Sequence, residues 1–252
     1  MPALPLALGL LIYYGGIQSS SFLLINQITQ YVPDRIWAGL TFLGNGWGTF
    51  ALAFPLLLLA PRLLSAGILA GLLGGLAIAI LKPLVNLPRP ASVLASGDFH
   101  QIGEALLYHS MPSGHTLTAF AVASGLYFAS AIEKRKALLC LFVLASLVGL
   151  SRSAVGAHWL SDEFVAVAIG LWCGILGSFF GELDSPWSVE LESLVASLYC
   201  TVRAVDHLPI THPKHGFGVQ SSFAICLCPT DCSDLSALCT GSAHSIQPLT
   251  HV

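Results

Sequence analysis

Long apolar runs separated by short polar connections form the main pattern of this chain. A helix that spans a bilayer needs about 20 mostly apolar residues. The runs that reach or nearly reach this length cover residues 4–26, 36–60, 63–81, 113–132, 137–151 and 158–180. The fifth run is short unless the side chains of Lys134 and Lys136 extend to the membrane surface from its start. The pattern predicts an all-α, polytopic membrane protein with six transmembrane helices.

Composition supports the membrane class and excludes two others. Charged residues make up 9% of the chain and hydrophobic residues 55%, whereas a soluble domain is about 25% charged. The net charge is −3 and no basic stripe with interleaved aromatics is present, so nucleic acid is not a predicted partner. No removable signal peptide precedes the first run, which is therefore expected to remain as a membrane helix.

The distribution of basic residues predicts the orientation. Positive charges favour cytoplasmic connections, and the connections with Arg62 and with the EKRK segment at 133–136 lie on one side of a six-span protein. We therefore expect both termini in the cytoplasm of a cell whose plasma (inner) membrane holds the protein. The opposite, periplasmic side receives residues 82–111 and the turn that contains Arg152. Basic residues on that side run against the rule and need another explanation.

The composition changes at about residue 183, which divides a membrane domain (1–182) from a C-terminal tail (183–252). The tail is rich in Ser, Cys and His and contains the segment CLCPTDC. Its Cys and His residues do not repeat the paired spacings of zinc sites, so a weakly structured tail is favoured over a metal site. A shifted reading frame would also explain the change, and comparing all frames of the coding DNA tests that explanation.

Three short motifs concentrate the ionisable residues on the periplasmic side: KPLVNLPRP, MPSGH and SRSAVGAHWLSDEF. Each has a structural explanation alone, since Lys82 can extend to the interface, Ser113 can cap a helix and His158 can be a buried structural histidine. Ionisable residues at membrane depth are costly and mostly functional. Their gathering at helix ends on one side therefore indicates a single site.

Phosphoryl transfer is the chemistry that these residue types fit. A phosphate needs fixed cations and N–H donors around its oxygens, which Lys82, Arg89 and Arg152 would supply. Ser113 and the backbone N–H of Gly114 lie at a predicted helix N-terminus, which favours anions.

A nucleophile and an acid complete the predicted site. His158 and Asp162 are four residues apart, so a helix places them on one face, where the carboxylate can hold one imidazole nitrogen protonated and leave the other free to attack phosphorus. His115 can protonate the leaving oxygen. Glu163 points to a different helix face and is expected to be structural or solvent-facing. No metal or cofactor is predicted. Structural roles are expected for the remaining loop residues His100, Glu104 and His109.

The motifs K-x6-RP, PSGH and SR-x5-H-x3-D, in this order, resemble those of the type 2 phosphatidic acid phosphatase (PAP2) superfamily, over residues 36–181. The resemblance implies a six-helix bundle, a phosphohistidine on His158, His115 as general acid and Asp162 as the residue that orients His158. It implies substrates such as phosphatidic acid, phosphatidylglycerophosphate or undecaprenyl diphosphate. The residues that it assigns to phosphate binding are Lys82, Arg89, Ser113, Gly114 and Arg152.

Other functions remain open at this point. A phosphohistidine enzyme can transfer its phosphoryl group to an acceptor lipid instead of water, and the residues do not separate the two reactions. Vanadium-dependent haloperoxidases resemble the same constellation but are soluble. A non-catalytic lipid-binding or transport protein could retain the cationic residues, although the presence of both histidines and Asp162 disfavours it. The expected partners are a lipid phosphate and the bilayer, and the oligomeric state is left open.

Overall fold

The computed structural model describes residues 2–55, 61–95 and 97–182, and all regular structure within them is helical. The predicted tail, with its Cys and His residues, lies outside the described residues. The helices are α1 (Ala3–Tyr14), α2 (Gln18–Thr29), α3 (Asp34–Leu43), α4 (Gly46–Ala53), α6 (Pro61–Val85), α7 (Pro90–Val93), α8 (Gly114–Ala129), α9 (Ile132–Ala154) and α10 (Leu160–Glu182).

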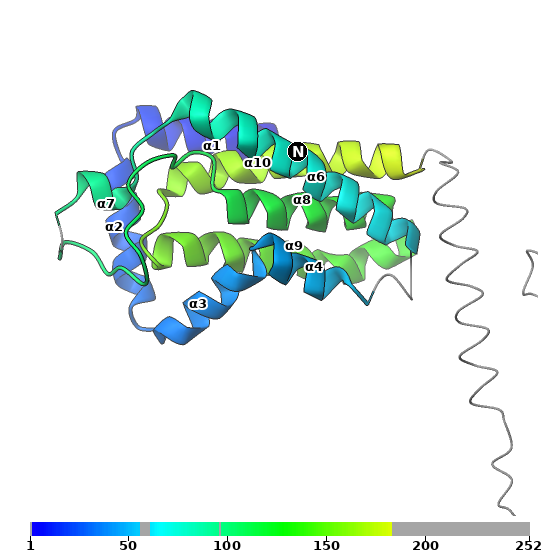
Figure 1. The fold of residues 1–252 in the computed structure, drawn as a ribbon, viewed down its shortest axis with the longest axis horizontal. Helices are drawn as coiled ribbons and strands as arrows, with labels where there is room; N and C mark the ends of the chain where they lie inside the picture. Colours follow the sequence, from blue (N-terminus) through cyan, green and yellow to red (C-terminus); the bar gives the residue numbers. More distant parts are fainter. Residues whose placement is uncertain (1, 56–60, 96, 183–252) are drawn as a thin grey trace, which may run out of the picture. The chain divides into compact units, whose positions relative to one another are not determined.

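Helices α8 and α10 form the centre of the bundle (Figure 1). Helix α10 packs against α8, α6 and α1, and α8 also packs against α9. Buried apolar side chains from α6, α8 and α10, among them Ala70, Leu117 and Ala166, make the central contact. The two helices that begin at the predicted site, and carry Gly114, His115 and Asp162, are therefore at the centre of the bundle.

A row of glycines on α10 allows this close packing. Its members are spaced by four, three and four residues, and so lie on one face of the helix: Gly170, Gly174, Gly177 and Gly181. A Cβ atom at Gly174 would lie 2.6 Å from the Cβ of Ser124 on α8, and one at Gly177 would lie 2.6 Å from the backbone nitrogen of Ala70 on α6. The backbones of α8 and α6 thus meet α10 at a distance that leaves no room for a side chain, as small residues permit in membrane bundles.

Three stretches among the described residues are long and apolar enough to cross a membrane: Leu63–Val93, Ile132–Ala154 and Leu160–Gly181. On the outer side of α6, the large side chains of residues 72, 76, 80 and 84 are all exposed, and a fourfold spacing places them in one row. A continuous apolar surface of this kind is unfavourable in water and favourable in lipid. The fold is that of an integral membrane protein.

The remaining predicted spans differ from simple helices. The run at 4–26 divides into α1 and α2, which meet at an angle of 107° and together make a fourth candidate span. Gly16, with φ of 70°, lies at this bend, a conformation that glycine adopts without steric cost. The run at 36–60 contains the short helices α3 and α4, separated at Gly44 and Asn45, and the run at 113–132 forms the 16-residue helix α8.

Candidate active site

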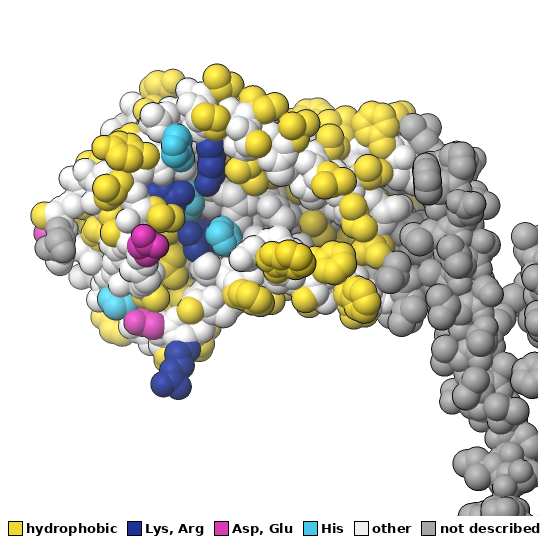
Figure 2. Space-filling view, in the orientation of Figure 1, with side chains coloured by type: hydrophobic (Ala, Val, Ile, Leu, Met, Phe, Trp, Pro, Cys, Tyr) yellow, Lys and Arg dark blue, Asp and Glu magenta, His cyan; other side chains and the backbone are white. Residues whose placement is uncertain are grey.

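The predicted site residues gather at one end of the bundle. Figure 2 shows basic and histidine side chains around a hollow, while hydrophobic side chains cover much of the remaining surface on that face. The positive charges of Lys82, Arg89 and Arg152 all act on His158, as does His115. The site is therefore built from four separate segments. They are the end of α6 with the loop after it, the start of α8, the end of α9 and the start of α10.

His158 and Asp162 form a buried pair. Nδ1 of His158 lies 3.3 Å from Oδ2 of Asp162, and both side chains are almost fully enclosed. Helix α10 begins at Leu160, so His158 precedes the helix and the prediction of one shared helical face was wrong for it. The two meet because Asp162, in the first turn, accepts the backbone N–H of Trp159 at 3.0 Å, as a residue of a capping box does.

Arg89 determines the tautomer of His158. Its Nη1 lies 3.2 Å from Nε2 of His158, and a guanidinium can only donate hydrogen bonds. Nε2 therefore accepts and carries a lone pair, while the proton on Nδ1 points to Asp162. Burial lowers the pKa of His158, and the charges of Arg89, Arg152 and Lys82 lower it further. The imidazole is thus neutral near pH 7, with its free nitrogen directed toward the cations.

Backbone carbonyls hold Arg89 in this position. Its Nε donates to the carbonyl of Tyr108 at 2.8 Å, Nη1 to that of Ala157 at 3.0 Å and Nη2 to that of His109 at 3.3 Å. The guanidinium is nearly buried. These contacts fix the plane of the group against the segments on both sides of the site, so little ordering is left for a bound ligand to impose.

The N-terminus of α8 lies beside Lys82. A Cβ atom at Gly114 would be 3.8 Å from Nζ of Lys82, so the ammonium lies against the first turn of α8. Ser113 is the N-cap residue, as predicted, but its side chain makes no capping bond and its Oγ lies 3.0 Å from Oγ1 of Thr116. The backbone N–H groups of this turn and the Lys82 ammonium together form an environment suited to an anion.

Arg152 belongs to the last turn of α9 rather than to the connection that follows it. Its Nη1 donates to Oγ1 of Thr41 at 3.4 Å. Its Nε is buried and, among the described residues, has no hydrogen-bond partner. An unsatisfied buried N–H on a charged group is costly, and an anion in the site would satisfy it.

Sequence reasoning missed the residues that hold the segments together. Asn26 of α2 is buried, and its Nδ2 lies within hydrogen-bond distance of the carbonyls of His100 and Ala154. Its Oδ1 accepts the backbone N–H of His100 at 2.8 Å. Asn26 thereby joins α2 to the end of α9, next to Arg152. In the sequence, the signal for this role was a polar amide side chain inside an apolar run.

Glu163 requires a correction. Its side chain is 5% exposed, so the solvent-facing alternative was wrong. Its Oε2 is hydrogen-bonded to Oγ1 of Thr116 on α8.

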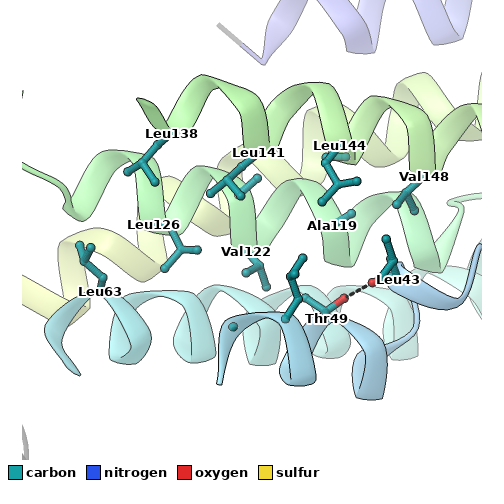
Figure 3. Close-up of a pocket in the computed structure, with 14 residues that line it drawn as sticks. Leu43, Thr49, Leu63, Ala119, Val122, Leu126, Leu138, Leu141, Leu144 and Val148 are labelled. Atoms are coloured by element: carbon teal, nitrogen blue, oxygen red, sulfur yellow. Dashed lines mark hydrogen bonds between the residues drawn. The ribbon is translucent and has the colours of Figure 1, made fainter. Parts of the chain in front are cut away.

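An apolar cavity of about 280 Å³ lies between α4, α6, α8 and α9 (Figure 3). On α8 it is lined by Ala119, Val122 and Leu126, which are four, seven and eleven residues after His115 and continue the same helical face. At Gly44, which follows the lining residue Leu43, a Cβ atom would be 2.9 Å from the Cβ of His115. The cavity therefore begins beside His115 and extends along the bundle.

Comparisons with known proteins agree with this arrangement. Residues 59–180 match the PAP2 superfamily. LpxE of Aquifex aeolicus has 30% sequence identity and a TM-score of 0.56, over 64% of this chain and 94% of that one. The transmembrane PAP2 type phosphatidylglycerolphosphate phosphatase of Bacillus subtilis shares the fold, with 21% identity and a TM-score of 0.54 over 73% of this chain and 95% of that one.

A curated relative matches over a shorter stretch. The lipid A 1-phosphatase of Porphyromonas gingivalis is 35% identical over 75 residues, which are 30% of this chain. The match covers 17% of the length of that relative.

Proposed function

Because this chain belongs to the PAP2 superfamily, we propose that it is a membrane phosphatase that hydrolyses a lipid phosphate or diphosphate through a phosphohistidine intermediate. The observation that carries this proposal is the state of His158, a neutral imidazole whose free Nε2 faces the guanidinium of Arg89. A nucleophile directed toward a fixed cation is what attack on an anionic phosphorus centre requires.

The proposed reaction has two steps. Nε2 of His158 attacks phosphorus, the bond from phosphorus to the lipid oxygen breaks, and His115 gives its proton to that oxygen. Water then attacks the phosphohistidine, loses a proton to His115, and releases inorganic phosphate and neutral His158. Asp162 holds Nδ1 in both steps and stabilises the positive charge that develops on the ring.

Five residues would bind the phosphate, and we call them the phosphate-binding cluster: Lys82, Arg89, Ser113, Gly114 and Arg152. The cations neutralise the phosphoryl oxygens, and the hydroxyl and the N–H groups at the start of α8 donate to them. The buried Nε of Arg152, which has no hydrogen-bond partner in the described part of the chain, supports this assignment.

The apolar cavity supports an amphiphilic substrate. A head group in the phosphate-binding cluster would place an acyl or prenyl chain along the wall of α8 that starts at His115. Phosphatidic acid, phosphatidylglycerophosphate and undecaprenyl diphosphate fit this description. The phosphate of lipid A also fits it, since one relative is a lipid A 1-phosphatase.

The proposal includes the membrane topology. Six apolar segments cross the plasma membrane, the bent pair α1 and α2 forms the first, and both termini are cytoplasmic. The basic EKRK segment in the first turns of α9 follows the connection from α8 and supports the cytoplasmic assignment of that connection. The site is then on the periplasmic side.

Phosphate release from lipid phosphates tests the function. We expect purified protein in detergent to release inorganic phosphate from at least one member of a panel of the four lipids, at a rate that EDTA does not change. The physical reason is that side-chain cations neutralise the phosphate. In addition, no group of three or more potential metal ligands occurs in the parts of the chain that the structure covers. Activity that requires an added divalent cation would contradict the mechanism, and a phosphorylated lipid acceptor in place of free phosphate would indicate a phosphotransferase.

Filling the apolar cavity should impair long-chain substrates selectively. Ala119→Phe adds a ring to the α8 wall, one turn from His115, and we expect it to lower kcat/KM for a long-chain lipid phosphate about tenfold or more. Turnover of a short-chain, water-soluble analogue should change less than twofold. Val143→Phe, at an exposed position of α9 outside the cavity lining, is the matched control. Equal losses for both chain lengths in Ala119→Phe would contradict this use of the cavity.

A further inference from the structure

Glu163 is a buried carboxyl that the proposed reaction does not use. It lies in the first turn of α10, and its Oε2 is hydrogen-bonded to Oγ1 of Thr116. Oγ1 of Thr116 in turn lies 3.0 Å from Oγ of Ser113. These three side chains, which we call the relay, connect a carboxyl on α10 with the serine of the phosphate-binding cluster.

The relay is enclosed where three helices meet. Thr116 and Ser113 are fully buried. On the side of α9, a Cβ atom at Gly149 would be 3.3 Å from Cγ2 of Thr116 and 3.6 Å from Oε2 of Glu163, so α9 approaches with its backbone. The charged neighbours that interact with Glu163 also belong to the site, namely Asp162, Arg152 and Arg89. A change at Glu163 is therefore transmitted to the phosphate-binding cluster rather than to solvent.

Each hydroxyl of the relay has one proton, and this determines which group donates and which accepts in each of its hydrogen bonds. The ionised oxygens of a phosphate only accept, so Ser113 must donate its single proton to bind one of them. The Oγ of Ser113 then accepts from Thr116, which has one proton as well. Thr116 must accept from Glu163, and a carboxyl donates only when it is protonated. An ionised Glu163 would instead draw the protons of both hydroxyls toward itself and leave Ser113 without one for the phosphate.

We propose that Glu163 is a positioning residue: in its protonated form it orients the hydroxyl of Ser113, through Thr116, toward the substrate phosphate. The inference rests on the proposed function for its substrate. Its hydrogen-bond logic applies equally to inorganic phosphate bound in the same cluster.

Two substitutions at Glu163 distinguish the loss of its hydrogen-bond donor from a change in the volume or charge of the side chain. In Glu163→Gln the amide N–H can donate to Thr116, and we expect kcat/KM and the affinity for inorganic phosphate to stay within about threefold of wild type. In Glu163→Met the side chain keeps a similar length without a donor, and both quantities should fall about tenfold or more, as expected for a lost hydrogen bond to a charged group. Calorimetric titration with inorganic phosphate measures the affinity without turnover. A Gln variant as impaired as the Met variant would overturn the proposal.

The middle of the relay provides an independent test. Thr116→Val removes the hydroxyl at nearly constant shape and should reproduce the loss of phosphate affinity seen in Glu163→Met. Thr116→Ser keeps the hydroxyl and should keep the phosphate affinity near that of the wild type. In a Ser113→Ala background, Glu163→Met and Thr116→Val should cause no further loss, because the relay acts only through Ser113. Full additional loss in that background would assign Glu163 a purely structural role. A wild-type protein that binds phosphate but hydrolyses no lipid would refute the proposed function and leave the relay intact.

Discussion

His158→Ala should abolish turnover of the lipid phosphate, with kcat lowered by about a thousandfold or more. The substitution removes the nitrogen that forms the bond to phosphorus in the proposed reaction. Single-turnover assays with the best lipid of the panel measure the loss. A phosphoprotein that is labile to acid and stable to base should be trapped with the wild type and not with His158→Ala. This result would identify the phosphohistidine.

His115→Ala is the matched control, because both histidines contact the same site and carry the same side chain. A general acid matters less as the leaving group improves. His115 also takes the proton of water in the second step, so the comparison is made on the first step alone. Changing from a lipid alcohol to p-nitrophenol should restore much of the single-turnover release of the leaving group in His115→Ala and none of it in His158→Ala. Equal rescue of both variants would refute the assignment of nucleophile and acid, and unchanged turnover in His158→Ala would refute the mechanism as a whole.

Asp162→Asn should lower kcat by about a hundredfold to a thousandfold while the fold is retained. The amide can still accept the N–H of Trp159 through its oxygen, so the cap of α10 survives. The same oxygen faces Nδ1 of His158, but the amide carries no negative charge, so it stabilises less well the positive charge that develops on the ring as Nε2 attacks phosphorus. Steady-state kinetics and the Tm in detergent, measured on the same preparation, separate the two effects.

Ser110→Ala is the control for Asp162. Ser110 donates to the same Oδ2 at 2.5 Å, so its removal takes one hydrogen bond from the carboxylate and leaves the negative charge beside His158 in place. We expect a loss of about tenfold or less. If Asp162→Asn were no worse than Ser110→Ala, the carboxylate would be a structural cap of α10, and its negative charge would have no role in the reaction.

The motifs predicted the composition of the site better than its geometry. Ionisable residues are so rare in this chain that their spacing alone indicated that Arg89, His158 and Asp162 belong together, and the structure places them in contact. The tautomer of His158 depends on Arg89, which lies 69 residues away in the chain. A pairing of this kind follows from tertiary structure and cannot be read from local pattern.

Hydropathy located the membrane segments but not their interruptions. A window that averages apolar character does not register Gly16, whose φ of 70° bends the first run, or the break at Gly44. The solvent-facing alternative for Glu163 was wrong for a related reason. Helical spacing correctly put it on a different face from Asp162, but the partner on that face, Thr116, comes from another helix.

The glycine row on α10 has a consequence for how substrate range can diverge. Backbone contacts at Gly174 and Gly177 position α10, and therefore the segment with His158 and Asp162, relative to α8 and α6. The outer wall of the apolar cavity is built instead from side chains of α4 and α9. Substitutions in that wall change the space for a lipid tail without moving the backbones that hold the reacting groups. In the proposed function, selectivity for the lipid tail and the reaction itself therefore depend on different contacts of the bundle.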